Sequence, residues 1–104
     1  MLVLDSSIWI EYFLKGTSGD RFSDAIEDSE NLIVPTISIY EVFKKVLATH
    51  GQDTALVQVR YMLSGNLVEL NDLLAVKSAK ISHEHKIPMA DSIIYATGQK
   101  YKAE

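Results

Sequence analysis

Short apolar runs alternate with segments of helical patterning along this sequence, and this alternation constrains the fold most. The apolar runs at residues 2–4, 31–34 and 67–70 are bounded by turn or cap residues, which is typical of short strands. Helices are predicted at residues 7–14, 20–29, 36–49, 71–85 and 88–101, and one more around Ala55, Leu56, Val59, Met62 and Leu63. Strands that alternate with helices form parallel sheets through right-handed crossovers. The prediction is therefore an α/β fold with a short parallel sheet flanked by helices.

Size and composition narrow the class of protein. A chain of 104 residues with 47% hydrophobic and 23% charged residues is typical of one globular domain. The absence of cysteine excludes disulfides and thiolate zinc sites, and it fits a cytoplasmic location. A net charge of −4 argues against a protein that coats nucleic acid through a basic surface. No apolar run approaches the ~18 residues of a membrane span, so no membrane partner is expected.

Three acidic residues stand beside apolar runs. Asp5 ends the first run, Glu41 follows Ile-Ser-Ile-Tyr, and Asp91 precedes Ser-Ile-Ile-Tyr. A desolvated carboxylate requires a cation or strong hydrogen-bond donors, and a hard divalent cation such as Mg²⁺ prefers carboxylate and water oxygens. In open parallel sheets, sites form beyond the carboxyl ends of the strands, where Asp5 is expected. The three acids are therefore candidates to converge on one metal.

Each acid also has a purely structural interpretation. Asp5 suits a turn or helix cap. Glu41 precedes Lys44 and Lys45 by three and four positions, so it suits an ion pair on a helix surface. Asp91 suits the positive end of a helix dipole. Taken singly, Asp5 is balanced between the two interpretations, the ion pair is favoured for Glu41, and the metal role is favoured for Asp91.

Three segments together resemble the PIN-domain ribonucleases, most closely the VapC-type toxins of toxin–antitoxin modules. These segments are residues 3–13 (VLDSSIWIEYF), 34–42 (VPTISIYEV) and 87–96 (IPMADSIIYA). The resemblance extends over essentially the whole chain. It implies a three-layer α/β/α fold and an endoribonuclease that depends on Mg²⁺ or Mn²⁺.

The resemblance also implies roles for individual residues and partners. The family's acids correspond to Asp5, Glu41 and Asp91 as catalytic and metal-binding residues, and the hydroxyl after the first acid corresponds to Ser6. Asp5 and Asp91 are expected to contact the metal directly. The expected substrate is single-stranded or looped RNA, and the expected partners are a cognate antitoxin and a second copy of the chain in a homodimer.

One departure from the family pattern concerns the end of the chain. Residues 1–104 are interpreted as a single PIN-like domain that lacks the usual C-terminal strand region, with its fourth acid, after the last helix. In the family fold this region lies beside the first strand, opposite the second strand. The open edge of residues 2–4 is therefore expected to be covered by further residues or by another chain.

Two other functions compete with the nuclease. A phosphoacceptor domain would need further acids beside Asp5, where this sequence has Ser6 and Ser7. A catalytically impaired module that acts mainly through the antitoxin or self-association stays open, because the helix after Asp5 has little polar surface. Its apolar side chains are Ile8, Trp9, Ile10, Tyr12, Phe13 and Leu14.

Overall fold

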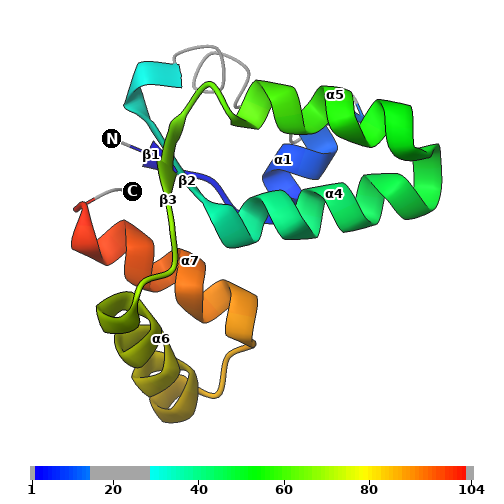
Figure 1. Cartoon of the computed structure of the whole chain (residues 1–104). Helices are drawn as coiled ribbons and strands as arrows, with labels where there is room; N and C mark the ends of the chain where they lie inside the picture. The colour runs from blue at the N-terminus through cyan, green and yellow to red at the C-terminus, as the bar shows by residue number, and fades with distance from the viewer. Residues whose placement is uncertain (1, 15–28, 103–104) are drawn as a thin grey trace.

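A computed structural model describes residues 2–14 and 29–102. Three parallel strands form one sheet in the order β1 (Leu2–Val3), β2 (Leu32–Pro35) and β3 (Asn66–Val68), as Figure 1 shows. Leu2 pairs with Leu32, and Ile33 pairs with Asn66. The predicted parallel sheet is confirmed. Pro35, expected just after the second strand, is its last residue.

Helices follow each strand, as the sequence predicts. They are α1 (Ser6–Phe13), α4 (Thr36–His50), α5 (Gln52–Met62), α6 (Asp72–His85) and α7 (Met89–Lys100), with a short 3-10 helix η1 (Ser29–Asn31) before β2. The helix expected at residues 20–29 lies outside the described residues, apart from Ser29 in η1. None of the helices in the described part is long and apolar enough to cross a membrane.

Local signals account for the helix boundaries. The Asn71 side chain accepts a hydrogen bond from the Leu74 backbone N–H at 2.8 Å, so it caps α6 as expected. Gly51 ends α4 with a φ of 87°, a conformation that residues with a Cβ rarely adopt. Pro88 precedes α7, in agreement with the predicted start. The helix ends at these positions are therefore determined by residues close to them in the sequence.

The sheet separates two groups of helices. Side chains of a strand alternate between its faces, and Leu32 and Val34 of β2 belong to the core cluster formed with α1, α4 and α5. Helix α7 packs on β1 and β2, and α6 packs on α7 (Figure 1). The expected three-layer arrangement is confirmed. Ala55 and Met62 of α5 are buried as predicted, whereas two other residues of the predicted stripe, Leu56 and the C-cap residue Leu63, are exposed.

Strand β1 lies at one edge of the sheet that the described residues form. It pairs with β2 and with no other strand of that part of the chain. That this edge is covered by further residues or by another chain stays a prediction.

Candidate active site

Asp5 lies just beyond the carboxyl end of β1 and begins α1. Its backbone is extended, with φ −65° and ψ 150°, and its carboxylate accepts a hydrogen bond from the Ser7 backbone N–H at 3.4 Å. Buried Leu4 and Trp9 anchor the chain on both sides of this point, while Asp5 itself is exposed. The cap interpretation of Asp5 is therefore confirmed. A single cap hydrogen bond leaves the carboxylate able to bind a cation as well.

Asp91 lies in the first turn of α7. The three residues that follow it, Ser92, Ile93 and Ile94, are buried, whereas Asp91 and Tyr95 are exposed. Burial of the opposite helix face therefore turns Asp91 away from the core. Its position also fits the structural interpretation, because a carboxylate near a helix N-terminus is stabilised by the helix dipole.

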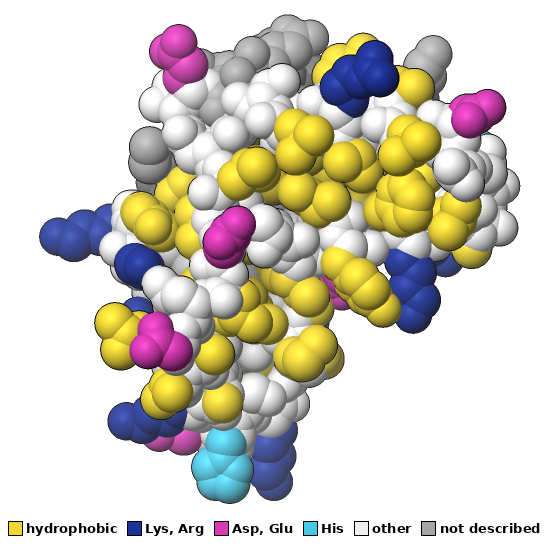
Figure 2. All heavy atoms as spheres, in the orientation of Figure 1, with side chains coloured by type: hydrophobic (Ala, Val, Ile, Leu, Met, Phe, Trp, Pro, Cys, Tyr) yellow, Lys and Arg dark blue, Asp and Glu magenta, His cyan; other side chains and the backbone are white. Residues whose placement is uncertain are grey.

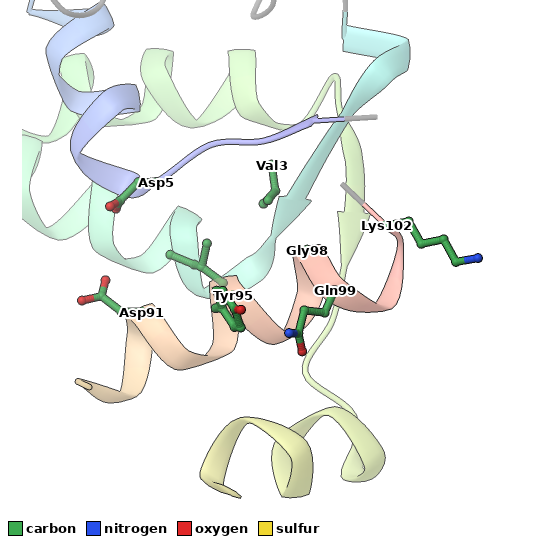
Figure 3. Close-up of a pocket in the computed structure, with 8 residues that line it drawn as sticks. Val3, Asp5, Asp91, Tyr95, Gly98, Gln99 and Lys102 are labelled. Atoms are coloured by element: carbon green, nitrogen blue, oxygen red, sulfur yellow. The ribbon is translucent and has the colours of Figure 1, made fainter. Parts of the chain in front are cut away.

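Asp5 and Asp91 line the same pocket, which has a volume of about 470 Å³. Figure 3 shows both acids toward one end of it and Lys102 at the other. The remaining lining residues are Val3, Ile94, Tyr95, Gly98 and Gln99. Two acids that are distant in the sequence thus border one solvent-accessible space, at the end of it that lies next to the carboxyl end of β1.

Glu41 is connected to this region through Ser6. The buried Ser6 hydroxyl donates a hydrogen bond to Glu41 Oε1 at 2.6 Å, between residues 35 positions apart. Within the described residues, Glu41 forms no ion pair with Lys44 or Lys45, so the surface-pair interpretation is not supported. Glu41 also borders a shallower pocket of about 290 Å³ together with those lysines and Tyr40.

The three carboxylates do not form one cluster. No group of three or more His, Cys, Asp or Glu side chains among residues 2–14 and 29–102 is placed to hold a metal ion. The structure brings Asp5 and Asp91 to one pocket and links Glu41 to Ser6. Their assignment as metal ligands stays a prediction.

The two carboxylates nevertheless fit a magnesium or manganese ion. Mg²⁺ in proteins usually keeps several water molecules and is held by one or two carboxylates. Asp5 and Asp91 supply two such groups beside an open space large enough for water. Glu41, held by Ser6, would then act on a metal-bound water or on a neighbouring carboxylate.

One expectation about the acids is wrong. Their apolar sequence neighbours suggested desolvated carboxylates, yet Asp5 and Asp91 are exposed and Glu41 is half-buried. Each acid lies near the start of a helix, where the chain leaves the core. Leu4, Ile93 and Ile94 are therefore buried without burying Asp5 or Asp91.

Three polar residues that line the pocket were not singled out from the sequence. Tyr95 and Gln99 follow Asp91 by four and eight positions on α7, and Lys102 lies two residues beyond the end of this helix. Tyr95 and Gln99 share one face of the helix with Asp91, so that part of the signal was present in the sequence. It became informative only when Asp91 was placed on a pocket.

The comparisons with known proteins agree with this architecture. The sequence model of the PIN domain matches residues 2–104. A solved structure, a toxin–antitoxin complex from Klebsiella pneumoniae, superposes with a TM-score of 0.77 at 21% sequence identity, over 100% of this chain and 82% of that chain. No match was found among curated proteins. At 21% identity the superposition establishes the fold, and the match over residues 2–104 establishes the family: this chain belongs to the PIN-domain family.

Proposed function

We propose that this chain is a VapC-type toxin of a toxin–antitoxin module and acts as an endoribonuclease that depends on Mg²⁺ or Mn²⁺. PIN domains are generally nucleases. The observation that carries the proposal is that Asp5 and Asp91 line one pocket together, at the end of it next to the carboxyl end of β1. This is where open parallel sheets place their ligands.

Each residue has a distinct role in this proposal. Asp5 and Asp91 hold the cation, and Ser6 orients the Glu41 carboxylate through its hydrogen bond. The bound cation would lower the pKa of a water molecule and neutralise charge on the phosphate during in-line attack. The exposed pocket suits an unpaired, single-stranded or looped RNA backbone, which can approach acids on a surface.

The proposed partners are an antitoxin protein and a second copy of the chain, in the cytoplasm. The similar solved structure is described as a toxin–antitoxin complex, which supports an antitoxin partner. Exposed apolar side chains gather over α4 and α5, as Figure 2 shows. They include Leu47, Leu56, Val57, Tyr61 and Leu63, which are 42–59% exposed. Apolar side chains grouped in this way are typical of interaction surfaces.

The direct test is RNA cleavage by the purified chain with Mg²⁺, with Mn²⁺ and with a chelator. We expect a labelled single-stranded RNA to be cut in the presence of either metal and to stay intact after chelation, because Asp5 and Asp91 cannot activate water without the cation. Cleavage that persists in excess chelator would show that the metal assignment is wrong.

The competing candidate is a PIN-like module with impaired catalysis that acts through the antitoxin or through self-association. It is favoured by the absence of a three-carboxylate group among the described residues. A chain that unfolds cooperatively, binds an antitoxin or itself, and cuts no RNA with either metal would support this candidate over the nuclease.

The Ser6–Glu41 hydrogen bond makes a separate prediction. Ser6→Ala removes the donor to Glu41 while keeping the small buried volume. Groups that orient the residues around a metal typically contribute 10–100-fold to activity, so we expect a loss of roughly 10–100-fold in metal-dependent cleavage. Initial rates at saturating metal measure this loss.

Ser7→Ala is the matched control for Ser6→Ala. Ser7 is the adjacent serine, it is exposed, and only its backbone N–H takes part in the hydrogen bond to Asp5. Alanine keeps that N–H, so the cleavage rate should change little. Equal cleavage rates for Ser6→Ala and the unsubstituted chain would show that the hydrogen bond from Ser6 to Glu41 does not contribute to catalysis.

A further inference from the structure

Lys44 and Lys45, the lysine pair, are the only two adjacent Lys or Arg residues in the sequence. Both are exposed, and they lie near the middle of helix α4. A helix dipole acts within the first and last turns, so it does not account for positive charge at this point. Within the described residues, neither ammonium group forms an ion pair with a carboxylate. The local structure therefore leaves two positive charges on this helix without an anionic partner.

The lysine pair flanks Glu41 on the helix surface. Glu41 precedes the two lysines by three and four positions, and residues with this spacing are neighbours on a helix. Its carboxylate instead accepts a hydrogen bond from Ser6 at 2.6 Å. The lysine pair and Glu41 line a pocket of about 290 Å³ together with Tyr40 and Ala48. This pocket therefore offers two ammonium groups to an anion, beside a carboxylate that already has a partner.

Tyr40 restrains one of the two ammonium groups. The Lys44 Nζ lies 5.7 Å from the centre of the Tyr40 ring, within the range of a cation–π interaction. An ammonium group has three hydrogen-bond donors, so contact with a ring face leaves donors for a phosphate oxygen. Lysine is a common ligand of phosphate groups, where it acts as a point charge. The lysine pair therefore suits the backbone of a nucleic acid.

Helix α4 places the lysine pair beside the candidate active site. It packs against α1, whose cap is Asp5, and against α7, which carries Asp91. The hydrogen bond from Ser6 joins Glu41 to the residue that follows Asp5. The lysine pair is therefore one helical turn from a side chain that contacts the neighbour of Asp5.

The pocket of the two aspartates indicates the direction in which RNA extends from them. In Figure 3 the acids lie toward one end of this pocket and Lys102 lies at the other. Between these ends the pocket follows Val3 of β1, the edge strand that further residues or another chain are expected to cover. RNA is therefore expected to leave the acids on the side of α4.

We propose that the lysine pair binds the phosphates that neighbour the one held at Asp5 and Asp91, so that single-stranded RNA passes from the two aspartates over Glu41 onto α4. This inference rests on the proposed nuclease function. Contacts with phosphates fix the position of a strand but carry no sequence information. Lys44 and Lys45 therefore position the RNA without selecting its sequence.

The salt dependence of RNA binding tests the proposal. The probe is a fluorescein-labelled 12-nucleotide single-stranded RNA of randomised sequence, and its anisotropy is followed from 50 to 200 mM KCl. All candidate acids are kept, and Ca²⁺ replaces Mg²⁺ because it binds the same oxygen ligands without the octahedral geometry that Mg²⁺ demands. In a plot of log Kd against log salt, each phosphate contact of a single strand contributes about 0.7 to the slope. The chain with both Lys44→Gln and Lys45→Gln should therefore have a slope about 1.4 smaller than the unsubstituted chain.

The chain with both Lys77→Gln and Lys80→Gln is the matched control. It loses two exposed lysines of α6 and changes the net charge equally, but neither lysine lines a described pocket that contains a candidate acid. Its slope should equal that of the unsubstituted chain. A chain with Lys44→Arg and Lys45→Arg keeps both charges, so it should also keep the slope. All these residues are exposed, so the variants should unfold in urea like the unsubstituted chain.

The outcomes separate this inference from the function on which it rests. If the unsubstituted chain cleaves RNA but the two α4 glutamines leave the slope unchanged, the lysine pair does not bind phosphate and the nuclease stands. Equal losses of slope for the α4 and α6 variants would show that only net charge matters, which also contradicts the proposal. If RNA binds with the expected slopes but is not cut in Mg²⁺ or Mn²⁺, the lysine pair binds RNA and the nuclease is wrong. If the unsubstituted chain neither binds nor cleaves RNA, both are wrong.

Discussion

Replacing Asp5 by asparagine is expected to reduce metal-dependent RNA cleavage by more than about 100-fold. Groups that only orient metal ligands contribute 10–100-fold, and a residue that contacts the cation directly should contribute more. Asparagine keeps the side-chain oxygen that caps α1 through Ser7, so the fold should persist. Loss of one negative charge near Asp91 should leave stability unchanged or slightly higher. Single-turnover cleavage rates and a denaturation curve measure the two effects.

Lys77→Ala is the control for the loss of one charged side chain. Lys77 is an exposed residue of α6 and lines none of the described pockets that contain the candidate acids. Its removal should leave the cleavage rate nearly unchanged. An Asp5→Asn chain that cuts RNA as fast as its parent would show that Asp5 does not bind the catalytic metal.

The largest expected effect on stability comes from Trp9. Its side chain is 1% exposed, belongs to the core cluster and stacks on Phe13 with ring centres 5.6 Å apart. Removing a buried aromatic side chain typically costs about 3–5 kcal/mol, so Trp9→Ala should remove a large part of a usual ~5–15 kcal/mol stability. Urea denaturation of the substituted and unsubstituted chains measures the difference.

Two further variants identify the cause of that loss. Trp9→Phe keeps an aromatic ring and removes the indole N–H, which has no hydrogen-bond partner within the described residues, so it should lose much less stability. Leu73→Ala removes a side chain that is 76% exposed and should change stability by less than about 0.5 kcal/mol. A Trp9→Ala chain as stable as Leu73→Ala would show that α1 is not anchored through this ring.

Trp9 also relates the core to the candidate site. It lies one helical turn after Ser6 and Asp5, at the start of α1. The burial of Trp9 fixes α1 against α4, the helix that carries Glu41. The 2.6 Å hydrogen bond from Ser6 to Glu41 therefore depends on the apolar packing of α1 against α4.

The identity and order of the described elements were predictable from the sequence. Each strand contains a short apolar run, although the third spans Asn66–Val68 instead of the predicted residues 67–70. The helix boundaries at Asp5, Gly51, Asn71 and Pro88 depend on local backbone conformations and hydrogen bonds. Such signals act within a few residues, so they can be read without the tertiary structure. The parallel pairing followed from the alternation of strands and helices.

Exposure was predicted less well. Leu56 and Leu63 fit the periodic apolar stripe of α5 but lie at the surface, because the packing of α5 on α4 buries only part of that stripe. Asp5 and Asp91 were expected to be desolvated and are exposed. Periodicity and neighbouring residues indicate which face of a helix is apolar, but only the packed neighbours determine how much of that face is covered.

The sequence by itself determined the strand–helix alternation, the caps, and the three acids and Ser6 as candidates. The tertiary structure alone decided that Asp5 and Asp91 share a pocket and that the Ser6 hydroxyl donates a hydrogen bond to Glu41. The physical reason is the distance along the chain over which the interactions act. Caps and turns are stabilised by neighbours in the sequence, whereas these side chains are brought together by the burial of Trp9, Val42 and Ile94, which lie in helices far apart in the sequence.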